Sequence, residues 1–154
     1  LPFMDYRRYM QQALTLASLA AARGEVPVGA LLVVQNKVVV TSANATEANA
    51  DSLAHAEILV LQKAQRLLKR RWLEDATLFV TMEPCPMCAG AIVLCRVGRV
   101  VYGCPDSHWG ACGSAFNIPE SRQSNFRPEL IGGILEEECR QVLQDFFRSR
   151  RQPD

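Results

Sequence analysis

Strand-like apolar segments alternate with amphipathic helical segments along most of this 154-residue chain. Apolar residues that recur every three or four positions indicate helices, whereas short runs rich in valine indicate buried strands. The predicted helices span residues 6–21, 54–69, 85–96 and 135–147, and the predicted strands span residues 28–34, 38–40, 77–81, 97–102 and 130–131. This alternation predicts an α/β fold with helices on both faces of one sheet.

The composition limits what such a chain can be. Apolar residues make up 49% of it and charged residues 21%, which is ordinary for a globular domain. A chain of this length can bury a sizeable core, so we expect residues 1–154 to form a single domain. No apolar run approaches the roughly 20 residues that cross a bilayer, and no secretory signal is visible. We therefore expect a cytoplasmic protein with no membrane partner.

With a net charge of +1, the chain is not strongly basic, unlike a typical nucleic-acid-binding domain. Cations gather locally at residues 69–71 and again at Arg148, Arg150 and Arg151. Positive side chains suit the C-terminal end of a helix dipole. Each cluster is therefore either a solvated helix end or a contact for an anionic partner.

Two short segments carry residues that commonly bind metals. His55-Ala56-Glu57 and Pro84-Cys85-Pro86-Met87-Cys88 each lie at the start of a predicted helix, so the two helix N-termini could face one another. One imidazole and two thiolates, from His55, Cys85 and Cys88, suit Zn²⁺ and leave its fourth position open for water. The dipole at a helix start also favours the thiolate form. The sequence therefore predicts a catalytic zinc site.

Glu57 lies next to a predicted ligand without being one itself. Zinc lowers the pKa of a bound water from about 15.7 toward about 7, which gives hydroxide at neutral pH, and a nearby carboxylate can carry the protons. This order of histidine, glutamate and paired cysteines is the signature of zinc-dependent nucleobase deaminases. It predicts hydrolytic deamination with Glu57 as the proton shuttle.

The other cysteines leave an alternative. A structural four-cysteine zinc site would be completed by Cys104 and Cys112, but these two lack the CxxC spacing, and such a site gives the histidine and the glutamate no role. Cys95 and Cys139 fall on apolar helix faces and are predicted to be core residues. The roles of Cys104 and Cys112 stay open.

From Tyr6 to Arg151 the chain resembles the bacterial tRNA-specific adenosine deaminases, which convert the wobble adenosine of tRNA to inosine. The matching residues are 24–30, 44, 54–58, 83–90, 99–103, 106, 110–111, 113–114, 145–148 and 150–151. The resemblance implies a cytidine-deaminase-like fold, which is a three-layer α/β/α sandwich around a mixed five-stranded sheet. It also implies a homodimer that acts on the tRNA anticodon stem-loop.

The resemblance further assigns residues to the substrate. Asn44 would hydrogen-bond the base, and Val28 would line the pocket beside it. The Ala56 N–H and the Pro84 carbonyl would hold the water and the leaving amino group. Asp106 would contact the nucleotides that flank the target.

The resemblance also places Phe147, Arg148 and Arg151 against the tRNA. Aromatic stacking and cationic contacts are how single-stranded loops are commonly bound. Phe146 and Phe147 both fall near the apolar stripe of the last predicted helix, so at most one of them is free for RNA. Trp109 adds a large aromatic surface that either faces RNA or packs under its loop.

The chain departs from the family pattern at Ala45, Pro105 and His108, where basic residues are common. Each change removes or weakens a phosphate contact, so the departures bear on RNA affinity rather than on the chemistry at zinc. One rival function is the deamination of a free base such as guanine or cytosine, because guanine deaminases share the paired-cysteine motif. A second rival is a non-catalytic, zinc-stabilised RNA-binding subunit.

Overall fold

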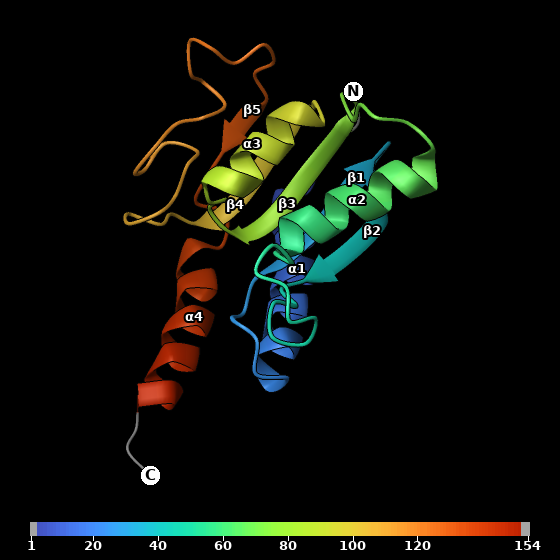
Figure 1. Ribbon diagram of the computed structural model, residues 1–154. Coiled ribbons are helices and arrows are strands. Elements are labelled where there is room, and N and C mark those ends of the chain that lie inside the picture. The colour runs from blue at the N-terminus through green and yellow to red at the C-terminus, as the bar shows by residue number, and fades with distance from the viewer. Residues whose placement is uncertain (1–2, 152–154) are drawn as a thin grey trace.

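The computed structural model describes residues 3–151 of the chain (Figure 1). Within these residues the helices and strands follow one another in the predicted order. They are α1 (Tyr6–Ala22), β1 (Gly29–Val34), β2 (Lys37–Ala43), α2 (Ala56–Leu68), β3 (Ala76–Met82), α3 (Pro86–Leu94), β4 (Arg99–Cys104), β5 (Glu129–Ile131) and α4 (Glu136–Arg151).

The strands form one mixed sheet in the order β2-β1-β3-β4-β5. β1 pairs antiparallel with both β2 and β3, whereas β3, β4 and β5 run parallel to one another. β3 and β4 can pair in parallel because α3 returns the chain from the end of β3 to the start of β4, whereas the long segment 105–128 makes the connection from β4 to β5. The structure therefore confirms the mixed five-stranded sheet.

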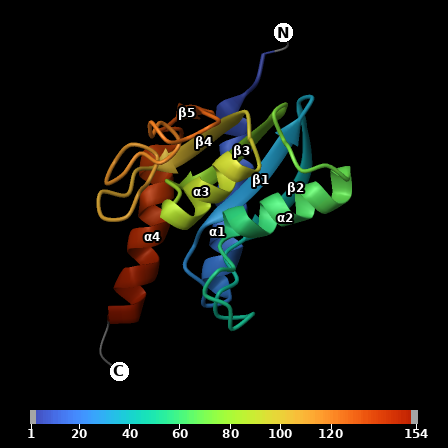
Figure 2. The same ribbon diagram turned by 45° about the horizontal axis from the view of Figure 1, so that its top comes forward.

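Helices cover both faces of the sheet, which gives three layers (Figures 1 and 2). Successive residues of a strand point to opposite faces, so Leu32 and Leu78 pack with α2 and α3 on one face. Leu31 and Phe79 pack with α1 and α4 on the other face. The predicted three-layer α/β/α sandwich is confirmed.

Several predicted boundaries differ from those observed. The second helix begins at Ala56 rather than at residue 54, because His55 has an extended backbone and forms the N-cap. The third helix ends at Leu94 rather than at residue 96, where Arg96 has a φ of 52°. The second strand extends to Ala43, well beyond residue 40, because its pairing with β1 continues to Gly29.

The last helix, α4, is amphipathic. Cys139 and Leu143 face the core, acidic residues occupy the first turn, and arginines occupy the last turn, as the helix dipole favours. Within residues 3–151 no helix combines the length and the apolar character needed to cross a membrane.

Candidate active site

One edge of the sheet gathers most of the predicted site residues. The parallel strands β3 and β4 both end there, so Glu83 and Asp106 follow them at the same edge. β1 runs antiparallel to β3, which brings its start, next to Val28, to this edge. β2 ends opposite the start of β1, where Asn44 follows. The topology thus places these loops around the starts of α2 and α3.

His55, Cys85 and Cys88 come together at this edge. The Nδ1 atom of His55 lies 3.6 Å from Cys85 Sγ and 3.5 Å from Cys88 Sγ, and all three ligand atoms lie within 4.8 Å of one another. His55 and Cys85 are the N-cap residues of α2 and α3, and Pro86 suits the first turn that follows. The two helix starts therefore aim their side chains at one point.

The two cysteines of this group differ in the ease with which they lose a proton. The pKa of the Cys85 thiol is lowered to about 4 because it accepts a hydrogen bond from Cys88 and lies against His55. The hydrogen bond to Cys85, with burial, raises the pKa of Cys88. A thiolate beside an imidazole and a second sulfur is a donor set that suits zinc. The residues therefore fit a zinc ion.

Cys104 and Cys112 do not belong to the metal-ligating group. Among residues 3–151 the set of ligand atoms within 4.8 Å consists of His55, Cys85 and Cys88. Cys104 is 2% exposed and Cys112 is 4% exposed, and both pack in apolar clusters. The four-cysteine structural site is therefore wrong for this chain. Of the predicted core cysteines, Cys139 is fully buried and Cys95 is half-buried at the end of α3.

A cavity of about 260 Å³, here called the site cavity, lies beside the metal-ligating group. Its wall includes His55, Cys85 and Glu57, and the rest comes from the strand ends and from the loops that follow them. Among these other wall residues are Val28, Asn44, Ala56, Met82, Asp106 and Trp109.

Glu57 is buried in the first turn of α2 and lines the site cavity. Burial raises the pKa of its carboxyl to about 7, although the nearby His55 acts in the opposite direction. A carboxyl with a pKa near neutrality can both accept and return a proton, which is the property that a proton shuttle needs. The geometry thus brings this carboxyl, the metal-ligating group and an open space together.

The residues expected to contact the base are not equally placed. Val28, Asn44 and Ala56 line the site cavity. The Asn44 side chain donates to the Val26 carbonyl at 3.2 Å, which holds its amide in one orientation. Pro84 is buried, and its carbonyl accepts a hydrogen bond from the Ala111 N–H at 2.8 Å. This hydrogen bond attaches the segment that follows β4 to the start of α3.

Glu83 is a site residue that sequence reasoning missed as a functional group. Its buried carboxylate accepts hydrogen bonds from the N–H groups of Asp106, Cys112 and Ser114, and from the Ser114 hydroxyl. A Cβ at Gly110 would lie 2.5 Å from this carboxyl, so only glycine fits there. Glu83 therefore anchors the irregular segment that follows β4. Its position just after a buried strand was the available signal.

Glu25 plays the same part on the other side of the site. Its carboxylate, 1% exposed, accepts hydrogen bonds from the N–H groups of Glu47 and Ala48 at 2.9 and 2.8 Å. These contacts fix the polar loop between β2 and α2, which carries Asn44 and leads to His55. Buried acidic residues thus anchor both loops that border the site cavity.

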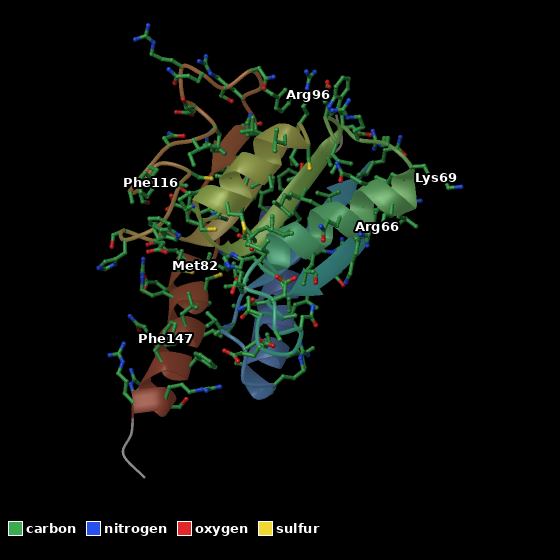
Figure 3. The ribbon with its side chains drawn as sticks, in the orientation of Figure 1. Arg66, Lys69, Met82, Arg96, Phe116 and Phe147 are labelled. Carbon is green, nitrogen blue, oxygen red and sulfur yellow. The ribbon has the colours of Figure 1, made fainter. Side chains whose placement is uncertain are left out.

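A second cavity, of about 550 Å³, lies between the loop after β4 and α4, and we call it the α4 groove. Phe147, Arg148 and Arg151 line it from α4, while Asp106 lines it from the loop. Met82 and Asp106 line both cavities, so the groove adjoins the site cavity. In Figure 3 Met82 lies between Phe147 and the start of α2.

The two phenylalanines of α4 differ in exposure. Phe147 is 39% exposed, whereas Phe146 is half-buried, with the Arg150 guanidinium 4.8 Å from its ring centre. Arg150 also donates to the Gly24 carbonyl and so ties α4 to the end of α1. At most one of the two rings was expected to be free for RNA, and Phe147 is the more exposed of the two.

The other basic cluster lies far from both cavities. Lys69 ends α2 at the opposite end from the metal-ligating group, and Figure 3 shows it well away from Phe147. Arg70 pairs with Asp75 at 2.8 Å, and the Arg71 guanidinium lies 5.2 Å from the Trp72 ring centre. These contacts fit the interpretation of residues 69–71 as a solvated helix end.

The chain is similar to known deaminases in sequence and in fold. A model of the MafB19-like deaminase family matches residues 4–151. A tRNA-specific adenosine deaminase of Bacillus subtilis is 45% identical and covers 93% of this chain and 89% of its own. The tRNA-specific adenosine deaminase of Haemophilus influenzae is 41% identical, and the match covers 94% of this chain and 84% of that protein.

Solved structures give the same fold. One, from a study of A-to-I editing by tRNA:A34 deaminases at the wobble position of transfer RNA, has a TM-score of 0.86 and 38% identity, and the match covers 88% of this chain and 99% of that one. A guanine deaminase of Bacillus subtilis has a TM-score of 0.65 and 25% identity, over 98% and 97% of the two chains. Both similarities extend over most of each chain.

Proposed function

Because the chain belongs to the MafB19-like deaminases and to the tRNA-specific adenosine deaminases, we propose that it deaminates the wobble adenosine of tRNA to inosine. The observation that carries the proposal is the convergence of His55, Cys85 and Cys88 with the buried Glu57 on one cavity. The net reaction adds water at the C6 atom of adenine and releases ammonia.

Zinc is the proposed cofactor, held by His55, Cys85 and Cys88. When bound, the ion would supply Lewis-acid activation of a water molecule at neutral pH. Metal analysis of the purified protein tests this role without reference to activity. We expect one zinc per chain, lost in His55→Ala and Cys85→Ser but kept in the control Cys95→Ser. Zinc retained by the ligand variants would contradict the assignment.

Glu57 is the proposed proton shuttle. Its carboxylate takes a proton from the water as the water oxygen bonds to C6, and it delivers that proton to the ring nitrogen N1. It then carries the second proton of the water to the amino group, which leaves as ammonia. Burial of Glu57 supports this role, because a desolvated carboxyl with a pKa of about 7 exchanges protons readily near neutral pH.

The base is proposed to lie in the site cavity, with Val28 against its ring and the Asn44 amide on its polar edge. Ala56 is the first residue of α2, so its N–H has no partner within the helix and can donate to substrate or water. The Pro84 carbonyl is the proposed acceptor for the leaving amino group, in addition to its contact with Ala111.

The RNA on either side of the target is proposed to follow the α4 groove. Asp106, Phe147, Arg148 and Arg151 line this groove, and Arg148 is exposed and pairs with Asp145 at 3.4 Å. An aromatic ring beside arginines can bind a single strand through stacking and phosphate contacts. The exposed His108 also lines the groove and would supply a weaker phosphate contact than lysine.

We further propose that residues 1–154 act as one deaminase domain, in a homodimer, in the cytoplasm. The family match over residues 4–151 supports the single domain. Residues 1–2 and 152–154 lie outside the part of the chain that the structure describes. Sedimentation of the full chain tests the dimer, which would appear at twice the 17.1 kDa of one chain.

Incubation with an anticodon stem-loop that carries adenosine at the wobble position tests the substrate. Free guanine, cytosine and adenosine are run in parallel, and the same RNA with its adenosine paired in the stem is the control. We expect inosine in the loop alone. Ammonia from free guanine, and none from RNA, would favour the second candidate, which the guanine deaminase similarity supports.

A further inference from the structure

Two large aromatic side chains are exposed on the segment that follows β4. Trp109 is 56% exposed and Phe116 is 43% exposed. Their ring centres lie 5.3 Å apart with an interplanar angle of 85°, so the edge of one ring meets the face of the other. Trp109 is not packed under its loop. Contiguous exposed apolar surface is where partners commonly bind.

The backbone holds this aromatic pair in place. The Trp109 N–H donates to the Asp106 carboxylate at 3.2 Å, and the Phe116 N–H donates to the Gly110 carbonyl at 3.0 Å. Glu83 in turn anchors the segment through the Asp106 N–H. The indole therefore projects from a well-anchored loop, which reduces the entropy lost when a partner binds.

Trp109 lies at the site cavity, close to Asp106, which lines both cavities. Trp109 lines the site cavity, whereas its neighbour His108 lines the α4 groove. A strand that places its target base in the site cavity and its backbone in the groove crosses this loop. Because Trp109 lines the site cavity and is 56% exposed, part of its indole also faces solvent, where a base next to the target can reach it.

We propose that Trp109, supported by the edge-on ring of Phe116, stacks on the base of a nucleotide adjacent to the target. The inference rests on the proposed RNA substrate and adds a specific contact to it. Stacking on an aromatic ring accepts any base, because each base has a π face. Stacking would bind a base, and it would partly replace the contacts to the RNA phosphate backbone that Pro105 and His108 weaken.

Trp109 can report on this contact directly. The chain has two tryptophans, and the other, Trp72, lies near Arg96, whose guanidinium is 4.1 Å from its ring centre, away from Phe116 in Figure 3. W72F combined with E57Q leaves Trp109 as the one tryptophan, which is excited selectively over the three tyrosines, and prevents turnover during titration. We expect the stem-loop to quench this fluorescence, and an abasic residue on one side of the target to abolish the quenching.

The matched control is W109F with E57Q, in which Trp72 remains and its fluorescence should not change. Quenching that persists with an abasic residue on either side would overturn the stacking proposal even if the RNA is a substrate. Base-dependent quenching without inosine formation by the wild type would support stacking and reject the proposed reaction. Fluorescence that changes only with protein concentration would mean that the pair contacts a second copy, and would also overturn stacking.

Binding constants separate stacking from simple apolar contact. W109L keeps an apolar side chain without a π face, whereas W109F keeps an aromatic ring. We expect W109L to raise Kd for the stem-loop by at least about fivefold and W109F to raise it much less. Equal Kd values for W109L and the wild type, with both proteins folded by circular dichroism, would contradict the proposal.

Discussion

The site cavity and the α4 groove adjoin one another but are built differently. In the site cavity the key groups are buried, at the starts of two helices, and Glu57 is 4% exposed. In the α4 groove the lining side chains Phe147, Arg148 and Arg151 are exposed, and Arg148 has 67% of its side chain accessible. Burial strengthens the electrostatic interaction between two charges, whereas water and salt screen the interaction between exposed charges.

This difference suggests that the site cavity serves the chemical step and that the α4 groove serves RNA binding. A buried carboxyl can have its pKa shifted to about 7, as in Glu57, whereas an exposed arginine contributes a screened attraction to phosphate. Changes in the site cavity should therefore alter kcat, and changes in the α4 groove should alter KM and its salt dependence. Three predictions test this division, from the largest effect to the smallest, and a fourth tests how burial acts on the other cysteines.

Glu57→Gln should lower kcat by about 10²- to 10⁴-fold, because the amide cannot carry the protons while the helix start keeps its shape. Single-turnover assays on the stem-loop measure the loss. Zinc content and RNA Kd serve as controls and should match the wild type. Turnover within twofold of the wild type would show that another group moves the protons.

Glu83→Ala should loosen the loop that borders both cavities. Several N–H groups would lose a charged acceptor, so we expect the free energy of unfolding to fall by about 3 kcal/mol. A misplaced loop should also lower kcat/KM by about 10- to 100-fold. Urea unfolding and steady-state assays measure the two effects.

The matched control for Glu83→Ala is Glu120→Ala, since Glu120 is exposed on the same segment and pairs with Asn117. It should leave both quantities nearly unchanged. If the two substitutions had equal effects, the anchoring role of Glu83 would be wrong.

Arg148→Ala and Arg151→Ala should each raise KM severalfold and leave kcat unchanged. If each arginine meets one phosphate, the slope of log Kd against log salt should fall by about 0.7 per substitution. Lys69→Ala removes a cation at the far end of α2 and should change neither slope nor KM. A fall in kcat without a change in KM would place these arginines in the chemistry instead.

The buried cysteines outside the metal-ligating group should weaken the fold at alkaline pH. Burial raises the pKa of Cys104 to about 11, and of Cys112 and Cys139 to about 12, from an ordinary value near 9. Between these values the unfolded chain binds fewer protons than the folded chain. The stability that these thiols contribute is therefore complete below about pH 9 and is lost as the pH rises toward 12.

Each such thiol should lower the free energy of unfolding by up to about 1.4 kcal/mol per pH unit within that window. Urea unfolding between pH 8 and 10.5 measures the slope. Cys139→Ala should reduce the slope by about one third, and a slope that is unchanged by this substitution would contradict the assignment. The contrast with Cys85, whose pKa is lowered to about 4, shows how a neighbour reverses the effect of burial.

Local sequence predicted the metal-ligating group well. His55, Cys85 and Cys88 lie at helix starts, where a proline and a short spacing leave a local signature that sequence analysis can detect. The anchors Glu25 and Glu83 left no such signature, because their partners are backbone N–H groups 22 to 31 residues away. The predicted start of α2 and the predicted end of β2 were also wrong. The N-cap at His55 sets the first boundary, and the pairing of β2 with β1 sets the second.

The sequence by itself determined the alternation of strands and helices, the zinc-type donor set and the presence of a carboxyl beside it. These features depend on residues close together in the chain. Only the tertiary structure decided that Cys104 and Cys112 lie outside the donor set, that Phe147 is more exposed than Phe146, and that Trp109 faces outward. Those outcomes depend on how distant strands and loops pack, because burial and exposure are properties of the whole fold.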